Sequence, residues 1–135
     1  MAKATRFFLD SIDDSQPALN YAVELQQAAS LVGFDWSDIS GIIDKIHEEA
    51  DEVTAELDEA DPARLQDEIG DLLFAITNLA RHLQIDPQLA LQQTNQKFRK
   101  RFAFIETQLQ RQGKTLQDAS LAEMDLLWEA AKQQS

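Results

Sequence analysis

Carboxylates are concentrated in one stretch of the chain, from His47 to Asp71. This stretch holds eleven Asp and Glu residues and one cation, Arg64, so it contributes −10 of the chain's net charge of −12. A solvated acidic helix usually places Lys or Arg one turn away from its acids, and that support is almost absent here. A solvated face is the commoner explanation of an acidic run, whereas uncompensated carboxylates favour a site for divalent cations.

The same stretch contains two apolar patterns with helical spacing. The first predicts a helix to about residue 60, whose core stripe is Ile42, Ile43, Ile46, Ala50, Val53 and Leu57. Asp61 followed by Pro62 is a typical helix start. It opens a second predicted helix, residues 62–83, with the stripe Leu65, Ile69, Leu72, Leu73, Ile76 and Leu83.

Two helices joined by so short a turn run antiparallel, so their acidic edges can meet. We expect Glu49 and Glu52 of the first helix to approach Glu68 and Asp71 of the second. Carboxylates without His or Cys suit hard cations, which favours Mg²⁺, with Mn²⁺ as the alternative ion.

The remaining composition limits the class of protein. The chain has 135 residues, 44% of them hydrophobic, and no cysteine. Because there is no long apolar run and no leader-like N-terminus, we expect a single cytoplasmic domain without membrane contact. The acidic balance argues against binding a nucleic-acid polymer, which needs a broad basic surface.

Outside the acidic stretch, the sequence pattern also predicts helices. Residues 1–16 are expected to form a loosely ordered N-terminal arm, and residues 17–135 the domain, which begins with a helix from Pro17 towards Gly33. The connector after it carries Phe34 and Trp36. These aromatics either plug the end of a bundle, which we favour from chemistry alone, or line a base-binding pocket.

A long helix is predicted from Pro87 to Gly113, and a capping box at Ser120 opens a final helix to Lys132. The long helix has an apolar seam that includes Phe98, Phe102 and Ile105. The seam favours a homo-oligomer, and packing within one bundle is the alternative.

Four bases also cluster on the long helix, and Lys97 and Arg101 lie one turn apart on one face. Such a pair can hold a phosphate, or it can pair with the acidic stretch itself. Trp128 in the final helix is either a structural lid or a stacking surface, and chemistry alone slightly favours structure.

Several motifs together resemble one family, the MazG-type all-α nucleoside triphosphate pyrophosphohydrolases, over residues 17–132. They are G-F-D-W at Gly33–Trp36, K-x-x-E-E-x-x-E at Lys45–Glu52, E-x-G-D-L-L-F at Glu68–Phe74, N-x-K-F-x-x-R-F at Asn95–Phe102 and M-x-x-L-W at Met124–Trp128. The resemblance implies an all-α bundle of four to five helices that dimerises.

The resemblance also implies roles for individual residues. The catalytic set would be Glu48, Glu49 and Glu52, with Glu48 orienting or deprotonating the attacking water. The Mg²⁺ ligands would be Glu49, Glu52, Glu68 and Asp71. The substrate-binding set would be Lys45, Lys97, Arg101 and Lys132 on the triphosphate, Trp128 stacked on the base, and Asn95, which matches the motif without a defined contact.

The implied reaction is hydrolysis of a nucleoside or deoxynucleoside triphosphate to the monophosphate and pyrophosphate, as nucleotide-pool housecleaning. Rival interpretations are a narrower hydrolase of dCTP or phosphoribosyl-ATP, and a non-catalytic helical module that binds cations. A di-iron bundle ranks last because it requires E-x-x-H pairs. The chain looks most like the C-terminal copy in two-domain members of the family, and whether it is a natural single-domain protein or a fragment is open.

Overall fold

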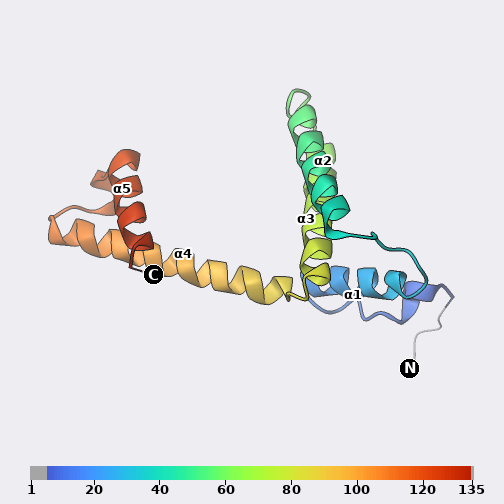
Figure 1. The fold of residues 1–135 in the computed structure, drawn as a ribbon. Helices are drawn as coiled ribbons and strands as arrows, with labels where there is room; N and C mark the ends of the chain where they lie inside the picture. Colours follow the sequence, from blue (N-terminus) through green and yellow to red (C-terminus); the bar gives the residue numbers. More distant parts are fainter. Residues whose placement is uncertain (1–5, 135) are drawn as a thin grey trace. The chain divides into compact units, whose positions relative to one another are not determined.

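The computed structural model describes residues 6–134, and within these residues the chain is all-α, as predicted from the sequence (Figure 1). No strand occurs in this range. The α-helices are α1 (Ala18–Ser30), α2 (Ile39–Leu57), α3 (Pro62–His82), α4 (Pro87–Arg111) and α5 (Leu121–Lys132), and the 3-10 helices are η1 (Phe8–Ser11) and η2 (Leu116–Asp118).

Capping side chains set the helix starts, and the caps at Asp61 and Ser120 lie where they were predicted. The Asp38 carboxylate accepts a hydrogen bond from the Gly41 amide at 2.9 Å, and the Asp61 carboxylate accepts one from the Ala63 amide at 3.0 Å. Ser120 and Glu123 form the predicted capping box at the start of α5. Each cap satisfies backbone donors that have no partner within the helix.

The helix ends depart slightly from the prediction. α2 ends at Leu57 rather than near Ala60, because Ala60 itself adopts a positive φ of 49° in the turn. α1 ends at Ser30, and the chain then reverses through Gly33, whose φ of 86° suits glycine. Within the predicted arm, residues 8–11 form η1 and pack on α1.

The chain divides into two compact units, residues 6–88 and residues 89–134. In the first unit α2 and α3 form an antiparallel hairpin, and α1 packs against α3 (Figure 1). Ile42 is fully buried there. In the second unit α5 contacts α4, and Ile105, Leu109 and Ala131 are buried.

The prediction that both apolar stripes of the hairpin are core is only partly correct. Ile42 of the first stripe is buried, but Ile43 and Leu57 are exposed, and Ile69, Leu73 and Ile76 of the second stripe are exposed as well. Each stripe is about 100° wide, and one neighbouring helix covers only part of such a surface.

No helix in the described part of the chain has the length and apolar character required to cross a membrane.

Candidate metal centre

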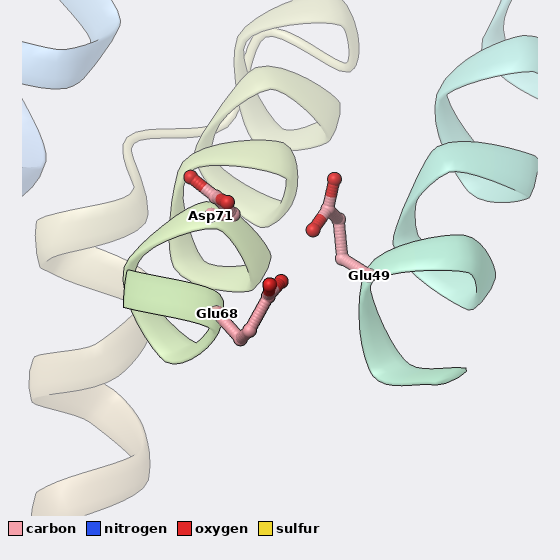
Figure 2. A group of neighbouring side chains, drawn as sticks. All are labelled: Glu49, Glu68 and Asp71. Carbon is pink, nitrogen blue, oxygen red and sulfur yellow. The ribbon is translucent and has the colours of Figure 1, made fainter. Parts of the chain in front are cut away.

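Three carboxylates meet between α2 and α3. Glu49 of α2 and Glu68 and Asp71 of α3 each place a carboxylate oxygen within 4.8 Å of the others (Figure 2). Glu49 is only 7% exposed, which is unusual for a glutamate, whereas Asp71 lies at the surface. The antiparallel hairpin thus brings together three of the four predicted ligands.

The carboxylates of this cluster oppose one another's ionisation. Desolvation raises the pKa of Glu68, and the charges of Glu52, Asp71 and Glu49 raise it further. Desolvation, Asp67 and Glu49 likewise raise the pKa of Asp71. The donor set is therefore all-oxygen, partly desolvated and self-repelling, which fits a hard divalent cation.

Glu52, the fourth predicted ligand, lies outside the group of three carboxylates that are within 4.8 Å. Its charge nevertheless raises the pKa of Glu68, so Glu52 lies along the same edge of the hairpin. Glu48 is exposed and borders the cluster through Lys45. A ligand role for Glu52 and a role in activating water for Glu48 stay predictions.

Lys45 supplies a positive charge beside the cluster. Its Nζ lies 3.0 Å from Glu49 Oε1 and 3.6 Å from Glu48 Oε1, one helical turn away. The hydrogen bond to Glu49 raises the pKa of Lys45, despite the opposing effect of desolvation. The ammonium group therefore holds the most buried carboxylate of the cluster, and contact of Lys45 with a triphosphate stays a prediction.

A cavity of about 850 Å³ opens beside the cluster within the first unit. Its lining includes Lys45, Glu49 and Asp71, together with Phe34 and Trp36 of the connector. Phe34 is 81% exposed and Trp36 is 45% exposed, so neither side chain is sealed in a bundle end. The structure thus contradicts our preference for an aromatic plug and places both rings at a cavity.

The remaining predicted substrate contacts belong to the second unit. Asn95, Lys97 and Arg101 lie on α4, and Trp128 and Lys132 lie on α5. The Arg101 guanidinium lies 5.6 Å from the Trp128 ring centre.

Other pairings also involve these side chains. The Trp128 ring lies 5.6 Å from that of Phe98, and Lys132 pairs with Glu129 at 3.3 Å. Trp128 is therefore packed on α4 and half-buried within its own unit. Base stacking by Trp128 stays a prediction.

Comparison with known proteins identifies the family. Residues 38–103 match the MazG nucleotide pyrophosphohydrolase domain. Over 134 residues the chain is 42% identical to the nucleoside triphosphate pyrophosphohydrolase of Escherichia coli K12. The matched residues make up 98% of this chain and 51% of that protein. The chain belongs to the MazG family.

A second MazG relative supports the assignment over almost the same length. The Thermotoga maritima nucleoside triphosphate pyrophosphohydrolase/pyrophosphatase MazG is 42% identical over 125 residues, or 92% of this chain and 48% of that protein. The YabN protein of Bacillus subtilis is 49% identical over 69 residues. The chain spans about half the length of the two MazG relatives.

One charged network of this MazG chain was missed at the sequence level. The Asp35 carboxylate accepts hydrogen bonds from the Arg81 guanidinium and, at 2.8 Å, pairs with His82 Nε2. The network ties the connector that carries Phe34 and Trp36 to the last turn of α3. Local spacing does not reveal this network, because Arg81 and His82 lie 46 and 47 positions after Asp35 in the sequence.

We predict that Asp35→Asn destabilises the protein at neutral pH. Desolvation raises the pKa of Asp35, but hydrogen bonds from Arg81, His82 and the Trp36 amide outweigh it and lower the pKa from 3.8 to about 2. Ionised Asp35 therefore stabilises the folded state fully above about pH 4, and this stabilisation is lost as the pH falls towards 2. Urea unfolding should show a loss on the order of 1 kcal/mol at pH 7, after allowance for solvent screening.

The difference in free energy of unfolding between wild type and Asp35→Asn should become smaller as the pH falls towards 2. Asp44→Asn, which changes an exposed acid on α2, is the control and should behave like wild type at both pH values. A constant difference between wild type and Asp35→Asn from pH 7 to pH 2 would show that ionisation of Asp35 is not the cause.

Proposed function

We propose that this chain hydrolyses nucleoside triphosphates, including deoxynucleoside triphosphates, to the monophosphate and pyrophosphate, with Mg²⁺ as the metal and Mn²⁺ as a substitute. The observation that carries the proposal is the cluster of Glu49, Glu68 and Asp71 at the edge of a cavity in a MazG-family chain. The names of the two MazG relatives support the reaction class.

Glu49, Glu68 and Asp71 would hold the metal, and Glu52 would complete the carboxylate set. When bound, a divalent cation offsets the charge of the triphosphate and lowers the pKa of bound water. Lys45 orients the Glu49 carboxylate through their 3.0 Å ion pair. Glu48 lies on the exposed side of that pair, where its carboxylate can accept a proton from water.

The proposed reaction forms a bond between the water oxygen and the α-phosphorus. The bond from the α-phosphorus to the bridging oxygen of the β-phosphate breaks, the water proton passes to Glu48, and pyrophosphate leaves. Within the first unit, Lys45 beside the carboxylate cluster is the proposed partner of the phosphates, since its charge offsets that of the leaving group. Phosphate contacts by Lys97, Arg101 and Lys132 stay predictions from the family resemblance. Such a chain would clear nucleotides from the cytoplasmic pool.

A panel of nucleoside triphosphates tests this proposal directly. Pyrophosphate release should require both the protein and Mg²⁺, and should stop when a chelator removes the metal. Lack of pyrophosphate release from all ribo- and deoxyribonucleotides in the presence of Mg²⁺ would overturn the proposed function.

We also propose that the protein forms a homodimer. Ile69, Leu73 and Ile76 lie on one stripe of α3 and are each 43–49% exposed, so the first unit alone leaves an apolar face without cover. Phe98, on the predicted seam of α4, is also 57% exposed. A second copy is the simplest cover for such surfaces.

We predict that light scattering at tens of micromolar gives twice the chain mass of 15.2 kDa. Leu73→Glu should shift the protein towards monomer, because the substitution places a charge in the apolar stripe of α3. Leu126→Glu, at an exposed position on α5, is the control. A monomer mass for the wild type would contradict the dimer.

A further inference from the structure

The cavity beside the carboxylate cluster has a chemically mixed lining. Leu9 of η1 and Leu25 of α1 are apolar members of the lining. Lys45, Glu49 and Asp71 are charged members, and the latter two belong to the carboxylate cluster. At about 850 Å³ the cavity has the size of a small-molecule site, so its occupant can combine an apolar body with a charged end.

Gln26 of α1 presents an unusual acceptor in the wall of this cavity. Its Nε2 donates to the Phe74 carbonyl at 2.9 Å and to Thr77 Oγ1 at 3.1 Å. Thr77 Oγ1 donates its own proton to the same carbonyl at 2.7 Å. Because a carbonyl only accepts, the Gln26 amide cannot be turned round, and its oxygen must face away from these partners.

The Gln26 oxygen is buried and has no hydrogen-bond partner among the described residues, and the whole residue is only 7% exposed. Buried acceptors without a partner are rare because they lose their water and gain nothing in return. Gln26 also lines the cavity. A ligand with an N–H group could supply the missing donor.

Asn78 of α3 offers the complementary group in the same cavity wall. Its Oδ1 accepts from Arg81 Nε at 3.1 Å and from Arg81 Nη2 at 2.8 Å. A guanidinium only donates, so the orientation of the Asn78 amide is fixed too and its Nδ2 remains as a donor. The cavity wall thus carries one acceptor and one donor whose orientations other residues determine.

Trp36 adds a flat apolar surface. A Cβ added at Gly41 would lie 3.4 Å from the Trp36 ring, an ordinary contact distance, so the ring rests close to the first turn of α2. The ring lines the cavity and remains 45% exposed. Large exposed aromatics at a cavity suit a planar aromatic ligand.

We infer that this cavity binds the nucleobase of the substrate, and that Gln26 accepts a hydrogen bond from an N–H group of the base. Asn78 donates to a neighbouring ring nitrogen or carbonyl, and the phosphates extend towards Glu49 and Asp71. Trp36 stacks on the ring, in place of the Trp128 stacking that the family resemblance implies. The assignment rests on the proposed function. Every common base carries an N–H group next to an acceptor, so this pair of amides accommodates several bases.

Calorimetric binding in the presence of Mg²⁺ tests the assignment without turnover. The probes are α,β-imido nucleoside triphosphates of the four bases, and inorganic tripolyphosphate as the ligand without a base. Gln26→Leu should raise the Kd of the best-bound nucleotide about tenfold, as expected for one hydrogen bond lost from a desolvated site, and should leave tripolyphosphate binding unchanged. Gln27→Leu, at the exposed neighbouring position, should bind both like wild type.

Trp36→Leu provides a second variant that does not alter a buried hydrogen bond. It should also weaken nucleotide binding and spare tripolyphosphate. Unchanged nucleotide binding by both variants, or equal affinity of wild type for nucleotides and tripolyphosphate, would overturn the base site and leave the proposed function intact. Failure of wild type to bind either ligand would overturn both.

Discussion

Replacing Glu49 by Gln is expected to reduce turnover at least a hundredfold while leaving the helical fold intact. Glu49 is the most buried of the three clustered carboxylates and the one that α2 contributes. Its loss would remove a full charge from the proposed metal site. Steady-state pyrophosphate release together with circular dichroism measures the two effects separately.

The matched control for Glu49→Gln is Asp51→Asn, which neutralises an exposed acid on the same helix, two residues away. It should retain activity near that of the wild type. Glu52→Gln should also lose turnover if Glu52 completes the metal site. Activity close to wild type in Glu49→Gln would remove the clustered carboxylates from the catalytic mechanism.

Mg²⁺ is expected to stabilise the folded protein strongly. The raised pKa values of Glu68 and Asp71 show that, without a cation, burial and the neighbouring acids disfavour the ionised cluster. A ligand at a hundred times its Kd adds about 2.7 kcal/mol of stability, which for a domain of this size raises the Tm by roughly 10 °C. Thermal unfolding with and without Mg²⁺ measures this effect.

Glu68→Gln separates repulsion from metal binding. Without Mg²⁺ this variant should be more stable than wild type, because one of the mutually repelling charges is gone. Addition of Mg²⁺ should raise the Tm of this variant by less than it raises the Tm of wild type. An equal rise in Tm for both proteins would show that the cation acts elsewhere on the acidic surface.

The sequence predicts the helices and the approach of Glu49 to Glu68 and Asp71, whereas Glu52 lies outside the three clustered carboxylates. Capping residues such as Asp38 and Asp61 act locally, so the helix starts are predictable. The short Asp61-Pro62 turn favours an antiparallel hairpin, and the apolar stripe of each helix turns Glu49, Glu68 and Asp71 towards the same edge. Helix ends were less certain, because the left-handed Ala60 has no clear signal in the sequence.

The cavity was not predictable from spacing. Gln26, Asn78 and the Asp35–Arg81 pair become neighbours only when α1 and the connector pack against α3, and these contacts join residues 46 to 51 positions apart. Gln26 looks like an ordinary helical glutamine until its amide partners are known. The aromatics of the connector were noted, but burial decides between a plug and a pocket, and burial is a tertiary property.

Identifying the phosphorus–oxygen bond that breaks is the most direct test of the central claim. Hydrolysis of a nucleoside triphosphate in ¹⁸O-labelled water with Mg²⁺, followed by mass spectrometry, identifies the phosphorus that water attacks. Attack at the α-phosphorus should place one ¹⁸O atom in the nucleoside monophosphate and none in the pyrophosphate. Nucleoside diphosphate and labelled orthophosphate as the first products, or the label in pyrophosphate, would contradict the account.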